Sequence, residues 1–364
     1  MTDPAADFVA LSFLPVTAWR DAGERLRAGE PPSAILDRWL ADRSPFASDL
    51  GAMLAAQTAE AIRRGAARGL TPILWSDAAY PPSLAAIVDP PPVLWTRGSL
   101  DGLNLPAVAV VGSRAASPYA LEVAQRLGAD LAARGLAVVS GLARGVDSAA
   151  HRGAVSAGGS TIAVLGCGAD IVYPAEHAPL VRAIKPHGLI VSELAPGTPP
   201  LPHFFPQRNR IISGLARAVV VVEAGEKSGS LITARCALEQ GRDVMAVPGN
   251  ILTGRNRGGH ALLKDGAKIV ETADDIFEEL GMCGDGSRVT SGDGSRAASA
   301  GRRPSPADPV LESLTAGEAC DLDEIAERSG LTTARLLPRL FELELKGSVA
   351  RVGGGRFVRI DRTC

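Results

Sequence analysis

The sequence predicts an α/β protein whose central part is a doubly wound parallel sheet with helices on both faces. Between residues 106 and 281, short apolar, β-branched runs alternate with stretches whose apolar residues recur every three to four positions. The runs are apolar almost throughout, as is typical of strands buried on both faces. Of the 364 residues, 46% are hydrophobic, only 4% are aromatic and 40 are glycine, which suits a sheet covered by Ala-rich helices.

The strands of this central domain are predicted from the apolar runs, and the helices from the periodic stretches between them. Helical spacing is clearest over Leu121–Ala133 and Leu231–Gln240. The expected strands are Ala107–Val111, Leu136–Ser140, Thr161–Gly166, Leu189–Ser192, Ala218–Glu223 and Asp243–Val247.

Two segments precede the central domain. Residues 1–75 are rich in Ala and Leu and are interrupted by prolines, which indicates a domain of short helices. Residues 76–105 form a Pro-rich connector that includes Pro90-Pro91-Pro92. Because proline fixes φ and lacks an N–H donor, we expect this connector to run extended along a surface.

Two further segments follow the central domain. Residues 282–309 are mainly Gly, Ser, Asp and Arg, cannot build a core, and are expected to be a flexible linker. Residues 310–364 predict helices near Leu314, over Leu322–Arg328 and over Thr332–Lys346, and then a hairpin of Val349–Val352 with Arg356–Ile360. Three helices and a hairpin are typical of a winged helix.

Composition restricts the classes of function. The net charge is −2, so a site for nucleic acid would have to be a local basic patch. The five cysteines show no paired short spacing, which favours reduced thiols over disulfides or a zinc site. The N-terminus lacks a basic run before an apolar stretch, and no segment approaches about 18 apolar residues. We therefore expect a cytoplasmic protein without a signal peptide or membrane span.

The turn after the first strand is a candidate anion site, since ligands of open α/β sheets bind beyond the carboxyl ends of the strands. Gly112 permits a tight turn, Ser113 follows, and Arg114 can contact a phosphate beside the N-terminus of the next helix. A dinucleotide fingerprint would need further glycines here and an acid about 20 residues on. Both are missing, which argues against NAD. The alternative is that Arg114 is a surface arginine at a turn.

The turn after the second strand contributes Arg144 as a second candidate phosphate contact. Asp147 and His151 would share one helix face, as a metal pair does. Two ligands without a third make a poor site, so we favour a helix-start acid beside a hydrogen-bonded histidine. No metal and no cofactor is predicted.

A third segment joins aromatic and basic residues. Phe204 and Phe205 precede Arg208, Asn209 and Arg210. Bases stack on aromatic rings while arginines hold phosphates, which is how proteins bind a single strand. Residues 201–268 contain ten Lys and Arg against five Asp and Glu, a local excess of +5. The alternative is that Phe205 packs in the core and Arg210 pairs with an acid.

The turn after the fifth strand carries Lys227, Ser228, Gly229 and Ser230 at the start of a helix. The spacing is not that of a Walker A loop. The backbone amides of residues 228–230 can still cradle a phosphate, with Lys227 alongside.

Taken in order, these motifs resemble the Rossmann-type domain of the DNA-processing protein A (DprA) family. The helical N-terminus is similar to that family's sterile-alpha-motif-like domain, and the tail to its winged helix. The motifs are Gly112-Ser113-Arg114, Ser140–Gly145, Tyr173-Pro174, Phe205–Ile212, Ser228–Ala234 and Gly241–Val244.

The resemblance implies a non-catalytic protein that binds single-stranded DNA without sequence preference. It also implies protection of DNA taken up in natural transformation, loading of the RecA recombinase, and a homodimer formed through the later half of the Rossmann-type domain. By motif, Arg114 is the main phosphate contact, Lys227 and Ser228–Ser230 line the same groove, and Phe204 is the stacking aromatic. Relatives often place a lysine after the Tyr-Pro motif, where this sequence has Ala175.

One rival is an enzyme. The fold also resembles that of nucleotide phosphoribohydrolases, whose Gly-Gly-x-Gly-Thr-x-x-Glu motif opens a helix at the same place. Aligning Gly229-Ser230 with its Gly-Thr puts Thr233 where the catalytic glutamate would be. Without that carboxylate, no group stabilises positive charge developing on the sugar.

The other rival is a duplex-DNA regulator that acts through the winged helix. A recognition helix needs basic and amide side chains toward the major groove. The third helix carries both basic and acidic side chains, so a protein-contact module or an accessory DNA site is favoured. It carries Arg335, Arg339 and Lys346, but also Pro338, Glu342 and Glu344.

Overall fold

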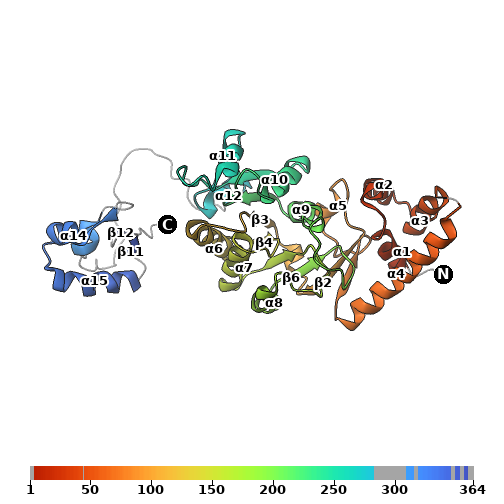
Figure 1. Cartoon of the computed structure of the whole chain (residues 1–364), viewed down its shortest axis with the longest axis horizontal. Coiled ribbons are helices and arrows are strands. Elements are labelled where there is room, and N and C mark those ends of the chain that lie inside the picture. Colours follow the sequence, from red (N-terminus) through yellow and green to blue (C-terminus); the bar gives the residue numbers. More distant parts are fainter. Residues whose placement is uncertain are drawn as a thin grey trace, which may run out of the picture. The chain divides into compact units, whose positions relative to one another are not determined.

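Among the described residues of the computed structural model, nine strands form one sheet that organises the larger of two compact units. Figure 1 shows the helices and strands of each unit, coloured along the sequence. The units are Met1–Gly286 and Ser287–Cys364. The structure describes residues 4–43, 45–282, 309–314, 319–345, 349–352 and 356–359. Apart from its two end residues, the linker predicted at 282–309 lies outside these ranges.

The strand order is β1-β2-β6-β5-β4-β3-β7-β8-β9, with β3 to β9 parallel to one another and β2 antiparallel to both of its neighbours, β1 and β6. The six predicted strands are all present, and their ends differ from prediction by at most two residues. The bounds are β1 (Thr71–Leu74), β2 (Val93–Gly98), β3 (Ala107–Val111), β4 (Ala137–Ser140), β5 (Thr161–Val164), β6 (Leu189–Ser192), β7 (Ala218–Val221), β8 (Asp243–Ala246) and β9 (Lys268–Ile269).

Helices cover both faces of this sheet, which confirms the doubly wound fold. Side chains of successive strand residues point to opposite faces. In β3, Ala109 packs in a core with Ile211 of α9 (Phe204–Leu215). Its neighbour Val110 packs in a second core with Ala124 of α6 (Pro118–Ala133). The other helices of this part are α7 (Val146–Ser156), η2 (Ala175–His177), α8 (Ala178–Ile184), α10 (Ser230–Glu239), α11 (Arg257–Lys264) and α12 (Ala273–Glu279).

The Pro-rich connector does not run along a surface, so that expectation was wrong. Its last part is β2, which pairs with β6 and buries Val93, Leu94 and Trp95. Tyr80 is also buried, and its hydroxyl donates to the Pro91 carbonyl at 2.7 Å. The prolines stop just before β2, so they remove no donor from the ladder. The connector also holds α5 (Pro82–Ala85) and η1 (Asp101–Asn104).

Four helices lie within residues 4–43 and 45–67 and share a core that includes Phe8, Leu11, Leu26 and Leu54. Prolines lie at or just before the starts of α2 and α3, where a missing N–H costs little. The bounds are α1 (Pro4–Leu11), α2 (Val16–Arg27), α3 (Pro32–Ala41) and α4 (Ala47–Ala67).

The second unit has the predicted winged-helix elements around a core that includes Leu314, Ile325 and Leu340. A short strand that the sequence did not reveal completes a sheet of order β10-β12-β11. The bounds are α13 (Pro309–Ser313), β10 (Ala319–Cys320), α14 (Leu322–Ser329), α15 (Thr333–Leu345), β11 (Val349–Val352) and β12 (Arg356–Arg359). In neither unit is a described helix both long enough and apolar enough to cross a membrane.

Close packing of α6 against α7 depends on a glycine. A Cβ at Gly153 would overlap the backbone oxygen of Gln125. We expect Gly153→Ala to lower the free energy of unfolding by about 3 kcal/mol, since the backbones would have to separate. Chemical denaturation followed by circular dichroism measures this.

The matched control is Gly51→Ala in α4. Its Cβ would meet Leu40 Cδ1 at 3.6 Å, an ordinary contact. Alanine also favours the helix more than glycine does. We expect this variant to be as stable as the wild type or more so, and equal destabilisation by both substitutions would contradict the packing explanation.

Candidate functional site

A cavity of about 730 Å³ lies at the carboxyl end of the parallel strands. Strands are added in one direction from β3 to β6, and then the chain returns to the other side of β3 to add β7. The loops after β3 and β7 therefore lead away from each other and leave a crevice. We call it the switch-point groove, and its lining includes Gly112, Ser113, Arg114, Asp147, Tyr173, Phe205, Arg208, Asn209, Lys227, Ser228, Gly229, Ser230 and Thr233.

The turn after β3 forms one wall of the groove. A Cβ at Gly112 would come within 2.9 Å of the Glu223 carbonyl oxygen, so the close approach of these backbones requires glycine. The amide of Ser113 donates to that same carbonyl at 2.7 Å. Arg114 is exposed, and its guanidinium carbon lies 5.3 Å from the centre of the Phe205 ring.

Glu223 joins the two walls, and sequence reasoning did not single it out. Its carboxylate accepts from the Ser117 hydroxyl at 2.6 Å and from the Ser117 amide at 3.1 Å. Ser117 in turn caps α6 by accepting from the amide of Ala120. A negatively charged side chain beside a predicted anion site would repel the ligand, so Glu223 did not stand out as a ligand contact. Its role, which is to hold Ser117, is visible only in the structure.

The turn after β7 forms the opposite wall. Lys227 and Gly229 are exposed, and the hydroxyls of Ser228 and Ser230 lie 2.8 Å apart. Asn209 Nδ2 donates to the Gly229 carbonyl at 3.2 Å and so fixes this turn to α9. The two predicted phosphate turns thus face one cavity, as the order of the strands requires.

Arg208 is a buried cation that lines this cavity. Its Nη1 donates to the carbonyl of Gly141, which follows β4, and to that of Val164, the last residue of β5. Burial lowers the pKa of Arg208 to about 10, and nearby Asp147 partly offsets this effect. The guanidinium stays charged at neutral pH and adds fixed positive potential to the groove.

Asp147 lies nearby, but its carboxylate is engaged with the backbone. Oδ2 accepts from the amides of Gly141 at 3.1 Å and Ala143 at 3.3 Å. Burial raises the pKa of Asp147. His151 instead bonds Thr161 Oγ1 through Nδ1 at 2.7 Å, and burial lowers its pKa to about 3. These contacts favour the acid at a helix start beside a hydrogen-bonded histidine, rather than a metal pair.

In the part of the chain that the structure describes, two aromatic rings reach the groove, and neither belongs to Phe204. Phe205 and Tyr173 both line it, with ring centres 5.5 Å apart and a tilt of 42°. Phe204 is the first residue of α9, and the centre of its ring lies 4.2 Å from the centre of the His203 ring. Adjacent helical residues project about 100° apart, so the two phenylalanines cannot share one direction. The structure therefore moves the candidate stacking aromatic from Phe204 to Phe205 and Tyr173.

Arg144 lies at the edge of the groove, not in its lining. It is exposed and forms an ion pair with Glu176. A phosphate could displace this partner, because exposed ion pairs contribute little stability.

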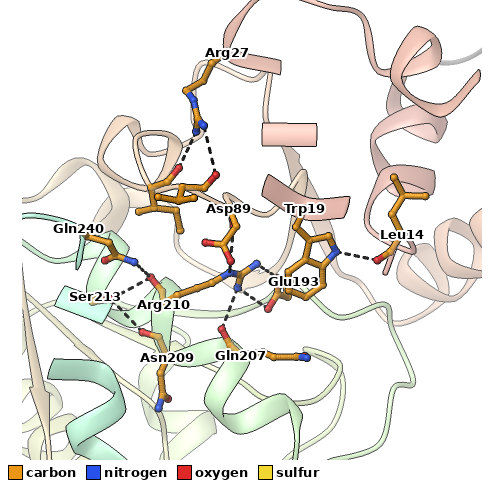
Figure 2. A network of polar contacts seen from close by, with 12 residues as sticks. Leu14, Trp19, Arg27, Asp89, Glu193, Gln207, Asn209, Arg210, Ser213 and Gln240 are labelled. Atoms are coloured by element: carbon orange, nitrogen blue, oxygen red, sulfur yellow. Dashed lines mark hydrogen bonds and ion pairs between the residues drawn. The ribbon is translucent and has the colours of Figure 1, made fainter. Parts of the chain in front are cut away.

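Arg210 is not available to a ligand, which corrects the prediction that it contacts DNA (Figure 2). Its side chain is 8% exposed, and its two terminal nitrogens bond both carboxylate oxygens of Glu193 at 2.9 and 2.6 Å. Nε donates to Asp89 at 3.0 Å, and the guanidinium carbon lies 4.8 Å from the centre of the Trp19 ring. Arg210 thus ties α9 to α2 and the connector. The alternative, pairing with an acid, is correct.

The fold and groove together define a class: doubly wound α/β proteins with a groove at the switch point, lined by basic and aromatic side chains, and an appended winged helix. A family model described as DNA recombination-mediator protein A matches residues 71–281, and a DprA winged helix domain model matches residues 295–355. The chain belongs to the DNA-processing protein A (DprA/Smf) family.

Its relatives agree with this assignment. Protein Smf of Escherichia coli K12 is 42% identical over 286 residues, covering 78% of this chain and 76% of the relative. A putative DprA of Mycobacterium tuberculosis is 45% identical over 273 residues, covering 74% and 69%.

Two solved structures resemble the chain. The X-ray structure of DprA from Streptococcus pneumoniae has a TM-score of 0.66 and 36% identity, and the match covers 77% of this chain and 98% of that one. A structure that describes the single-stranded DNA binding mode of DprA from Helicobacter pylori has a TM-score of 0.53 and 28% identity, covering 58% and 97%.

The burial of Arg210 leads to a test of its structural role. Arg210→Met would leave the Glu193 carboxylate buried without its partner. We expect a loss of about 3–5 kcal/mol in the free energy of unfolding, measured by chemical denaturation.

Arg144→Met is the matched control, since it removes the same guanidinium from an exposed ion pair. We expect its unfolding midpoint to stay close to that of the wild type. A structural role for Arg210 is untenable if the two variants unfold alike.

Proposed function

We propose that this chain binds single-stranded DNA without sequence preference in the switch-point groove, and that it catalyses no reaction there. The observation that carries the proposal is the meeting of cations, serine hydroxyls and two aromatic rings in one cavity. The family assignment and the DNA binding mode described for the Helicobacter pylori protein support it.

Phosphates are held at the two walls. Arg114 and Lys227 are exposed on opposite turns and supply mobile charge. The backbone amides of Ser228 and Ser230 donate within the turn, to the Gly225 carbonyl and to the Ser228 hydroxyl, so the hydroxyls of this turn rather than those two amides face a phosphate. The buried charge of Arg208 attracts phosphate from below. Arg144 adds a contact at the edge. Such contacts do not depend on base identity.

Bases stack on Phe205 and Tyr173. Every base has a flat face, so stacking tolerates any sequence. Arg114 lies over the Phe205 ring, so a phosphate held by Arg114 places the neighbouring base beside the aromatic pair.

The side chains around the groove favour binding over catalysis. Thr233 lines the groove where a phosphoribohydrolase would have its glutamate. The carboxylates of Asp147 and Glu223 are hydrogen-bonded to neighbouring backbone or hydroxyl groups. Neither is placed as a free base or nucleophile.

The proposal extends to assembly and biological role. Ile251 and Leu252 are 79% and 89% exposed, and Leu238 and Ile269 are exposed nearby in sequence. Exposed apolar residues in the later half of the domain support a homodimer formed there. The family's description as a recombination mediator supports a cytoplasmic role in natural transformation, in which the protein protects incoming DNA and loads RecA on it.

Binding can be measured by fluorescence anisotropy with a labelled oligothymidylate over a salt series. We expect salt-dependent binding that matched duplex competes for poorly. Arg114→Ala should weaken binding to all sequences and reduce the slope of log affinity against log salt by about 0.7, the value for one phosphate contact on a single strand.

The control is Arg126→Ala, an exposed arginine on α6 that lies 3.8 Å from Asp130. It removes the same charge away from the groove lining and should leave the slope unchanged. No binding at low salt by folded wild-type protein would overturn the proposed function.

A further inference from the structure

A second basic segment lies beside the groove but is not part of its lining. It is the loop between β8 and α11, which carries Arg255, together with Arg257, the first residue of α11. Arg255 Nη1 donates to the Ala115 carbonyl at 3.1 Å, next to the turn after β3. The Arg255 carbonyl oxygen lies 3.9 Å from the Cβ position of Gly225, on the turn after β7. The loop therefore adjoins both walls of the groove.

Asn256 holds this loop in place. It is buried, its Oδ1 accepts from the Ala224 amide at 2.9 Å, and its Nδ2 donates to the Val247 carbonyl at 3.0 Å. The Gly258 amide also bonds the Ala224 carbonyl, at 2.8 Å. The loop is thus fixed to the carboxyl ends of β7 and β8. A ligand that binds there orders little additional backbone, which favours binding.

Both arginines are available to an anion. Arg257 is 69% exposed and its partner Glu226 lies 3.6 Å away and is equally exposed, a pair that a phosphate can displace. Arg255 is exposed, and its guanidinium keeps further N–H donors besides the one bonded to Ala115. The two arginines flank one buried asparagine, Asn256, which holds the backbone between them in place.

We propose that Arg255 and Arg257 form a second phosphate-binding subsite, which carries the sugar–phosphate backbone of a single strand out of the switch-point groove and across the carboxyl ends of β7 and β8. This inference rests on the proposed function. Because neither side chain lines the groove, a strand short enough to fill only the groove does not reach them. The subsite contributes affinity only for longer strands.

Strand length separates the two subsites. Anisotropy would be measured at low salt with oligothymidylates of about 5 and about 25 nucleotides, for wild type and for Arg255→Ala/Arg257→Ala. We expect unchanged affinity for the short strand. For the long strand we expect about tenfold weaker binding, at roughly threefold per arginine, and a salt slope lower by about 1.4.

Two further variants sharpen the test. Arg126→Ala removes an arginine that is 73% exposed beside an acid. It should leave the affinities for the short strand and for the long strand unchanged. Glu226→Gln removes the carboxylate that competes for Arg257, and should tighten long-strand binding with no effect on the short strand.

Three outcomes would overturn the second subsite. The double variant could bind the long strand as tightly as Arg126→Ala does, or its affinity could fall equally for the short and the long strand. The third outcome is a Glu226→Gln variant that binds the long strand no more tightly than the wild type. In each case wild-type protein still binds oligothymidylate and the proposed function survives. Failure of the wild type to bind either length would instead remove the proposed function and the subsite together.

Discussion

The site depends on the pairing of β3 with β7. Four residue pairs, from Val108 with Ala218 to Val111 with Val221, hold together two strands that are far apart in sequence. This pairing brings the turn after β3 and the turn after β7 to one edge of the sheet, and Glu223 joins them through Ser117. Without it, the two basic turns would be separate surface loops and no groove would exist between them.

Helix α9 connects this groove to the rest of the larger unit. One side of the helix supplies Phe205, Arg208 and Asn209 to the groove. The next residue, Arg210, turns toward Glu193, Asp89 and Trp19, where the N-terminal helices and the connector meet the sheet (Figure 2). A buried, bidentate ion pair loses much of its attraction when either partner moves, so it fixes the rotation of α9. The position of Phe205 in the groove therefore depends on contacts outside the groove.

The features that could be predicted from the sequence are those set by local pattern. Apolar runs gave the six strands, and the rule that ligands bind beyond their carboxyl ends brought Arg114 and Lys227 to one site. The remaining features depend on tertiary partners. β2 is a short apolar run beside prolines, and only its pairing with β6 makes it a strand. Arg208 and Arg210 are two residues apart and chemically identical, yet only the positions of Gly141 and Glu193 decide which faces the groove. Phe204 and Phe205 are adjacent, and which ring faces the groove depends on where α9 begins. The sequence pattern did not predict that start.

The most direct test of single-strand binding in this groove is photocrosslinking of the full chain to an oligonucleotide that carries 5-iodouracil, followed by identification of the crosslinked peptides. Stacked aromatic residues react efficiently with such bases. Crosslinks at Tyr173 and Phe205, lost when excess unlabelled single strand is added, are the expected result. Crosslinks confined to the winged helix, or to Phe204 with neither groove aromatic labelled, would contradict the assignment of the switch-point groove as the binding site for the strand.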